Sequence, residues 1–203
     1  MCKKYLILLL PLFFSSCTLA GKLIFGASNL KPVSVEKIRK SGTKYGIDSC
    51  YIYTIRQNQY LKYFSKQSTF PYNLVYDKAG HLLQLEPNSG CHSSERLINR
   101  LRPDSTFSFV NDSSFYQFPT LLEGLHHEPF NIESLPDADF YVFIFSGTFA
   151  GRLNKSYFNS WLGEIEKNKK ARIQVIYISL DMRKDWDIDA LERQFEEIAS
   201  SKK

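Results

Sequence analysis

An α/β fold is the class that the sequence predicts, and three features of the 203-residue chain indicate it. Hydrophobic residues make up 43% of the chain and aromatic residues 15%, which is enough to build a packed core. Two nearly continuous apolar runs, 137–146 and 171–180, are typical of strands that are covered on both faces of a sheet. A helical pattern follows each run, over 153–167 and 187–200, and this strand–helix–strand order predicts a right-handed parallel crossover.

The N-terminus has the pattern of a secretory leader. Two lysines precede an apolar run, 5–14, that is too short to span a bilayer as a helix. Two serines then separate this run from Cys17. The arrangement resembles a bacterial lipoprotein signal peptide, in which such a cysteine is acylated and the leader is removed in front of it. One departure is Phe14, because the lipoprotein pattern prefers Leu at that position.

This resemblance divides the chain into a signal peptide (1–16), a tether (17–32) and a folded α/β domain (33–203). Lipid on Cys17, palmitate included, would hold the domain at a membrane. The expected location is the bacterial cell envelope, lipid-anchored in the outer membrane and facing the periplasm, since no Asp follows Cys17. The alternative is an ordinary cleavage site that leaves Cys17 unmodified.

The four cysteines are expected to have different roles. Cys2 leaves with the leader and Cys17 carries the lipid, so that two cysteines remain in a compartment where disulfides form. We expect a disulfide between Cys50 and Cys91. Two unpaired buried thiols, or a redox role for either cysteine, are the alternatives.

The first part of the domain, 33–110, holds a predicted hairpin followed by a helix. Strand patterns over 72–76 and 81–84 flank residues 77–80, a turn whose glycine accommodates positive φ. An amphipathic helix is expected over 93–102. The elements expected before the hairpin are a short helix over 34–40, capped by Ser34 and stopped by Gly42, and a strand over 50–55.

The second part, 124–203, contains the most informative stretch, 145–153, where the first apolar strand meets its helix. Its sequence, FSGTFAGRL, resembles the active-site turn of the thioredoxin-like superfamily, nearest the periplasmic thiol reductases that are tethered to membranes. Ala150 stands where the attacking cysteine of that family would be, and Leu153 where the resolving cysteine would be. The next strand and its exit, 177–186, also resemble the family.

The altered turn lacks the groups that the family's reaction requires. The nucleophile is a thiolate at a helix N-terminus, where the helix dipole lowers the thiol pKa. A second thiol then resolves the mixed disulfide. Neither Ala150 nor Leu153 carries sulfur, so dithiol exchange at this turn is excluded on chemical grounds.

The order of the remaining elements differs from the family pattern. The family places a proline, often cis, before a hairpin and a final helix, whereas here Pro71, the hairpin and the helix precede the turn. In one interpretation the two parts share a circularly permuted sheet, which would place Pro71 near Ala150. In the other interpretation, the two parts are two incomplete copies of one fold. We favour one thioredoxin-like sheet flanked by helices, because neither part alone holds enough strands for a core.

The resemblance also implies a binding groove at the altered turn. The family holds substrate polypeptide with an exposed aromatic residue at the position of Phe149, and Ala150, Arg152 and Pro71 complete the candidate groove. Arg152, at a helix start, is suited to an acidic group on a partner. We therefore expect an envelope lipoprotein whose redox-inactive domain binds or scaffolds a protein or peptide partner.

Two rival functions are kept beside this one. The first is a thiol–disulfide oxidoreductase that uses Cys50 or Cys91 as its reactive thiol. The second is a structural lipoprotein of a surface complex, without any groove that binds. We lean against an enzyme, because the usual turn has no thiol.

Composition and motifs argue against several other classes. The formal net charge is only +5, and no dense Lys/Arg block of the kind that binds nucleic acid occurs. No Gly-rich phosphate loop or nucleophile elbow occurs either. The acidic residues of 181–189 and the pair His126-His127 are expected in turns or loops instead of a metal centre. We therefore expect no cofactor, no metal and no nucleic acid.

Overall fold

The computed structural model describes residues 31–64, 66, 70–85, 92–187, 189–191 and 193. The expectations for the leader, for Cys17 and for Cys91 lie outside these residues, as does most of the helix expected over 187–200. Within the described ranges, no helix is both long and apolar enough to cross a bilayer.

In the described part of the chain, seven strands form one mixed sheet in the order β4-β3-β2-β6-β7-β1-β5. Strands β6, β7 and β1 run parallel to one another, and the other neighbouring pairs are antiparallel. Both parts of the chain contribute to the sheet, so the α/β class is confirmed. The strands are β1 (Ile52–Ile55), β2 (Tyr72–Asp77), β3 (His81–Leu83), β4 (Phe109–Ser114), β5 (Leu122–Gly124), β6 (Phe140–Ser146) and β7 (Ile173–Ser179).

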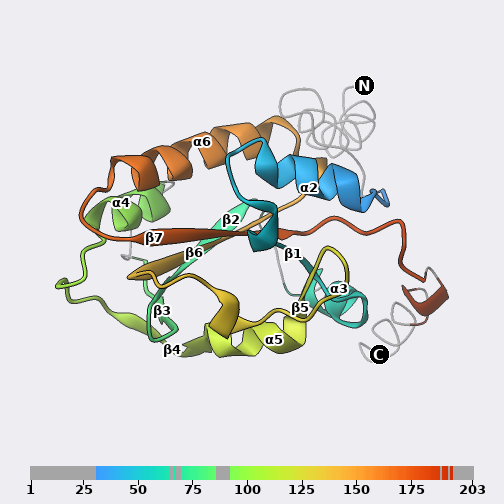
Figure 1. Ribbon diagram of the computed structural model, residues 1–203, viewed down its shortest axis with the longest axis horizontal. Helices are drawn as coiled ribbons and strands as arrows, with labels where there is room; N and C mark the ends of the chain where they lie inside the picture. The colour runs from blue at the N-terminus through green and yellow to red at the C-terminus, as the bar shows by residue number, and fades with distance from the viewer. Residues whose placement is uncertain are drawn as a thin grey trace, which may run out of the picture.

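Helices cover both faces of the sheet (Figure 1). On one face lie α2, α4 and α6, and on the other lie α3 and α5. The α-helices are α2 (Val35–Thr43), α3 (Gln57–Phe64), α4 (Ser93–Arg100), α5 (Phe118–Leu121) and α6 (Arg152–Lys167). Single 3₁₀ turns are η1 (Ser49–Tyr51), η3 (Phe115–Gln117), η4 (Ile132–Ser134) and η5 (Thr148–Ala150).

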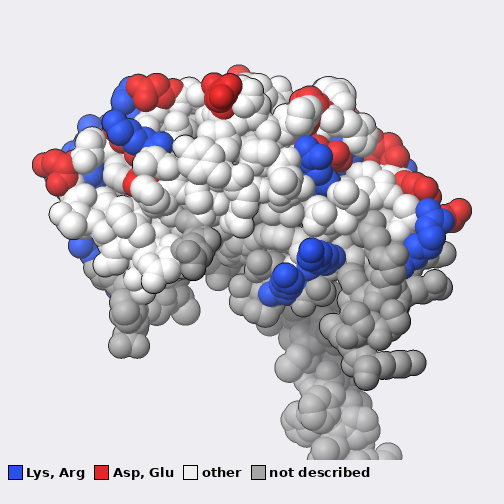
Figure 2. All heavy atoms as spheres, turned by 90° about the horizontal axis from the view of Figure 1, so that it is seen from below, with Lys and Arg blue, Asp and Glu red and all other residues white. Residues whose placement is uncertain are grey.

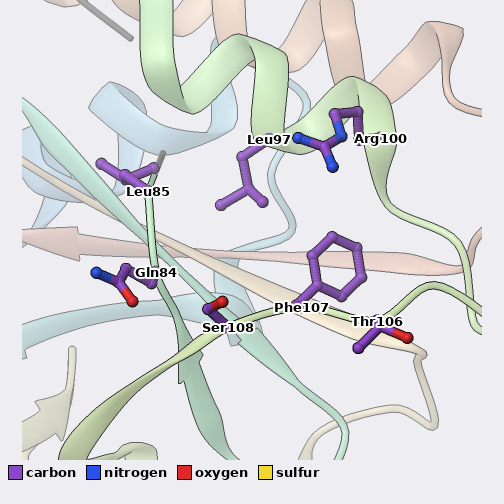
Figure 3. A pocket seen from close by; sticks show the side chains of 7 residues that line it. All are labelled: Gln84, Leu85, Leu97, Arg100, Thr106, Phe107 and Ser108. Atoms are coloured by element: carbon purple, nitrogen blue, oxygen red, sulfur yellow. The ribbon is translucent and has the colours of Figure 1, made fainter. Parts of the chain in front are cut away.

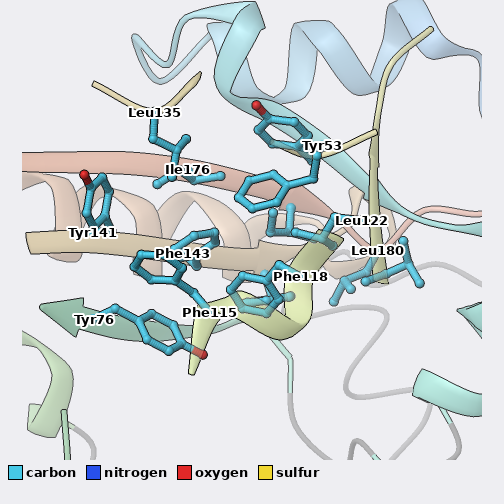
Figure 4. Close-up of a cluster of buried hydrophobic side chains, with 14 of the residues drawn as sticks. Tyr53, Tyr76, Phe115, Phe118, Leu122, Leu135, Tyr141, Phe143, Ile176 and Leu180 are labelled. Atoms are coloured by element: carbon cyan, nitrogen blue, oxygen red, sulfur yellow. The ribbon is translucent and has the colours of Figure 1, made fainter. Parts of the chain in front are cut away.

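The central strand β6 explains why its sequence is apolar at almost every position. All seven of its residues are buried. Because side chains alternate along a strand, Tyr141, Phe143 and Phe145 join the core on the α5 face. Phe140, Val142 and Ile144 join the core under α6. Figure 4 shows the first of these cores, where Phe143 lies close to Phe118 of α5 with 4.6 Å between the ring centroids.

The predicted hairpin and its turn are present. Strand β2 pairs with β3, the N–H of Gly80 donates to the carbonyl of Asp77 (3.0 Å), and Gly80 has φ of +86°. The predicted N-cap is also present, because Ser34 Oγ accepts from the N–H of Lys37 at 3.3 Å. The expected role of Gly42 as a stop is wrong, since α2 continues to Thr43 and Gly42 packs against Ile52.

Other boundaries shift for local reasons. The strand expected from residue 50 begins at Ile52, because Asp48 caps the 3₁₀ turn η1 by accepting from the N–H of Cys50 (3.1 Å). Strand β4 spans Phe109–Ser114 and pairs with β3. The helix expected over 93–102 ends at Arg100.

The chain enters the domain beside the exit of β7. Val33 donates from its N–H to the carbonyl of Met182 (2.8 Å) and accepts from the N–H of Lys184 (2.9 Å). Only 6% of Val33 is exposed. Since β6 and β7 are parallel, this entry lies at the same end of the sheet as the turn after β6.

Candidate functional site

The altered turn is a compact link between β6 and α6. After Ser146 and Gly147 the chain makes the 3₁₀ turn η5, in which the N–H of Ala150 donates to the carbonyl of Gly147 (3.0 Å). Gly151 then has φ of +56° and directly precedes α6. That conformation favours glycine, so the Gly in this turn has a backbone role.

Asp181, at the exit of β7, holds this turn from the neighbouring strand. Its carboxylate accepts from the backbone N–H of Thr148 (2.9 Å), from the Thr148 hydroxyl (2.8 Å) and from Ser179 Oγ (3.0 Å). Only 2% of Asp181 is exposed. Burial raises the pKa of this carboxyl, and the hydrogen bonds from Thr148 and Ser179 act in the opposite direction. Asp181 therefore has a structural role in the turn.

Asn154 fixes the other side of the turn from the first part of α6. Its Oδ1 accepts from the hydroxyl of Ser146, and its Nδ2 donates to the carbonyl of Gly147 at 2.7 Å. Asn154 is 5% exposed, so these bonds form away from solvent. The sequence analysis did not identify Asn154. The sequence signal that could have identified it is an asparagine in the first turn of an amphipathic helix.

Pro71 lies next to the altered turn. Strands β2 and β6 are antiparallel with Tyr72 opposite Phe145, so Pro71 is placed beside the last residue of β6. The Phe70–Pro71 peptide bond is cis. The ring of Phe70 makes an edge-on contact with the ring of Phe149, with 6.1 Å between centroids. The sheet thus brings the proline of the first part to the turn of the second.

The four candidate groove residues lie at one end of the sheet, but they are not equally accessible. Pro71 and Ala150 are buried, the latter with 4% exposed. Phe149 is half-buried and Arg152 is exposed. Phe149 also lies near Phe64 of α3, with 6.3 Å between the rings. The surface that a partner can contact therefore comes from Phe149 and Arg152.

Cys50 lies at the other end of the sheet. It precedes β1, whereas the altered turn follows β6, and these strands run in the same direction. Cys50 is exposed and has no disulfide partner within the described part of the chain. Partial burial and the neighbouring Asp48 carboxylate raise the pKa of Cys50. These surroundings disfavour the thiolate.

A second polar cluster surrounds Arg183, which the sequence analysis also did not identify. The Arg183 side chain is 1% exposed, and its Nε and Nη2 donate to the Asp185 carboxylate at 2.9 and 2.6 Å. It also donates to the carbonyls of Gly124 (3.2 Å) and Leu125 (3.0 Å). The Arg183 guanidinium lowers the pKa of Asp185 to about 2. The cluster ties the exit of β7 to the loop after β5.

The two neighbouring histidines, His126 and His127, contact different side chains. His127 lies 3.3 Å from both Glu123 and Asp185, whereas His126 approaches Arg39 at 3.3 Å. Among the described residues, no group of three His, Cys, Asp or Glu side chains is arranged to hold a metal ion.

Comparison with known proteins gives no relative. No protein family, curated protein or solved structure matches the chain. The class of protein is therefore the one that the fold itself defines, a mixed α/β protein with a seven-stranded sheet flanked by helices in its described part.

Proposed function

We propose that this protein is a membrane-anchored envelope lipoprotein whose redox-inactive, thioredoxin-like domain binds a protein or peptide partner at the altered turn. The observation that carries the proposal is the turn itself. It is held by Asp181 and Asn154, it presents Phe149 and Arg152 to a partner, and Ala150 and Leu153 occupy the positions of the two thiols.

The topology supports the thioredoxin-like part of the proposal. The resemblance implies a strand, turn, helix and parallel strand, and β6, η5, α6 and β7 have this order and pairing. It also implies a proline before a hairpin and a helix. Pro71, β2, β3 and α4 supply these elements, with β2 antiparallel to β6 and α4 packed beside α6. A permuted order of the two units accounts for the hairpin coming first in the chain.

The surroundings of Cys50 weigh against the oxidoreductase alternative. A reactive thiol needs positive groups nearby that favour the thiolate. Asp48 has the opposite effect on Cys50, which in addition lies far along the sheet from the turn. Cys91 lies outside the described residues, so the proposed Cys50–Cys91 disulfide stays a prediction.

The distribution of charge is more consistent with recognition of a partner by a few side chains than with attraction by a strong electrostatic field. On the face shown in Figure 2, basic and acidic side chains of the described residues are interspersed along the rim, and the central surface is uncharged.

Site-specific photo-crosslinking in cells tests the binding proposal. A photoreactive amino acid at Phe149 is expected to give a discrete crosslinked product that Arg152→Glu weakens. The control position is Tyr116, which is 63% exposed and lies by the hairpin turn at the opposite end of the sheet. Equal products from both positions, or none from position 149, would contradict binding at the turn.

Metabolic labelling tests the anchor separately. Cells fed an alkyne analogue of palmitate are expected to label the protein, and Cys17→Ser should abolish the label and release the protein from the membrane fraction. Cys50→Ser is the matched control, and it should leave labelling and membrane association unchanged. An unlabelled wild-type protein would contradict the anchor without affecting the crosslinking result.

A further inference from the structure

A cavity of about 300 Å³ lies between α4 and the β2–β3–β4 side of the sheet. Its walls are apolar and come from all four elements or their immediate ends. The lining residues that matter here are Asn73 and Val75 of β2, Leu83 and Leu85 at β3, Leu97 of α4 and Val110 of β4. Leu85 and Val110 are 41% and 38% exposed, so the cavity has an apolar mouth at the surface.

Two polar residues, Asn73 and Gln84, line this cavity, and Asn73 is the buried one. Asn73 is only 7% exposed, and neither its Oδ1 nor its Nδ2 has a hydrogen-bond partner among the described residues. It lies opposite Ile144 of β6, on the sheet face that α4 and α6 cover. A buried amide with no partner destabilises the folded state, and an apolar residue of similar size at this position would avoid that penalty. The fold therefore retains an unpaired donor and acceptor at an apolar cavity.

A second cavity of about 270 Å³ adjoins the first, and the two share Gln84, Leu85 and Leu97. Figure 3 shows this second cavity, with Leu97 and Arg100 directed down from α4 and Phe107 directed up toward them. Of the shared residues, Leu85 and Leu97 give the two cavities a common apolar side, while Arg100, Thr106 and Ser108 make the second cavity more polar. Together the two cavities offer room for a chain of several carbon atoms beyond the group that meets Asn73.

We propose that this site binds a small molecule with an apolar chain and one amide group. An amide matches Asn73 because it both donates and accepts, and so satisfies Nδ2 and Oδ1 together. A carboxylate accepts only, and would leave Oδ1 without a donor. A hydrocarbon fills the walls but leaves both atoms unpaired. This site is separate from the altered turn, and the inference does not depend on the function proposed there.

Calorimetric titration of the purified full-length chain with hexanamide tests the inference. Two matched probes, N,N-dimethylhexanamide and hexanoate, keep the apolar chain but cannot donate a hydrogen bond. We expect saturable binding of hexanamide, with the two probes weaker by about tenfold or more, as the loss of one well-made hydrogen bond implies. Asn73→Leu is expected to reduce hexanamide affinity by a similar factor while raising the melting temperature.

Thr54→Val provides the matched control. Thr54 is fully buried and its side-chain oxygen also lacks a partner among the described residues, but it does not line this cavity. This variant should also raise the melting temperature, yet leave the affinity for hexanamide unchanged. The inference is overturned if hexanamide shows no saturable binding, if the three probes bind equally, or if Asn73→Leu binds hexanamide as tightly as the wild type.

Discussion

Thr148 donates two groups to Asp181, its backbone N–H at 2.9 Å and its hydroxyl at 2.8 Å. This pair joins the turn after β6 to the exit of β7, two segments that lie 33 residues apart in the sequence. The carboxylate thereby accepts from the backbone N–H of Thr148, in the way that a side chain caps the start of a helix. Because the bond is buried, it also makes the turn sensitive to the protonation of Asp181.

Asp181 and Asp185 are expected to change stability with pH in opposite directions. Burial raises the pKa of Asp181 above its unfolded value near 3.9, so the folded state holds its proton more tightly. The stability that comes from protonated Asp181 is fully present below the unfolded pKa and is lost as the pH rises through the raised pKa. Asp181→Asn should remove this loss of stability at rising pH.

The Asp185 contribution has the reverse sign. Its pKa is lowered to about 2, so the stability it provides is present above about 3.9 and is lost as the pH falls toward the lowered pKa. Asp185→Asn should flatten this acid limb. Urea unfolding of wild type and both variants across this acidic range measures the two slopes. Parallel curves for all three proteins would refute the assignment.

Two helical glycines should respond oppositely to alanine. A Cβ at Gly42 would lie 2.6 Å from Ile52 Cδ1 and 3.0 Å from Tyr177 Cδ1, so Gly42→Ala should cost about 1–3 kcal/mol of unfolding free energy. A Cβ at Gly163 of α6 would have no atom within 4 Å, so Gly163→Ala should add about 0.5–1 kcal/mol. Chemical denaturation measures both. A neutral Gly42→Ala would show that α2 can move away from β1.

Restoring the two thiols should test how closely the turn follows the thioredoxin-like arrangement. Ala150→Cys/Leu153→Cys places one thiol just before α6 and one inside its first turn, where the helix dipole favours a thiolate. We expect an intramolecular disulfide on oxidation and catalysis of insulin reduction by dithiothreitol, neither of which wild type should show. Ala150→Ser/Leu153→Ser is the control for polarity. A folded double-cysteine variant without either property would count against the proposed fold family.

Gly147 should control the position of Phe149. A Cβ at Gly147 would lie 2.2 Å from the Phe149 ring, so Gly147→Ala should displace that ring from Phe70. We expect weaker crosslinking at position 149 and a stability loss of about 1–2 kcal/mol, partly relieved when Phe149→Ala is added. If the stability losses of the single variants simply add, the ring and the glycine do not compete for the same space.

The sequence predicted the parts of the fold that have a local pattern. Strand β6 is buried over its whole length and β7 from Ile176 onward, so their apolar runs were visible, and Gly80 marked the hairpin turn. The short strand β5 was not predicted. It is three residues long and depends on pairing with β1, far away in the sequence.

The candidate site was predicted in outline for the same reason. The altered turn could be recognised from consecutive residues, and Pro71 from the order of elements. The burial of Ala150 and the role of Arg183 could not, because they depend on packing between distant segments. Arg183 donates to Gly124, 59 residues earlier in the chain, and no local spacing encodes that contact.

The position of Val33 has a mechanical consequence for the anchored protein that we propose. Val33 is held between Met182 and Lys184, immediately after Asp181. Tension on a lipid-tethered domain would therefore enter the fold at the exit of β7 and load the segment that fixes the altered turn. The attachment point and the candidate binding surface would then lie on one path of force, so that pulling on the tether acts on the partner site before it reaches the rest of the sheet.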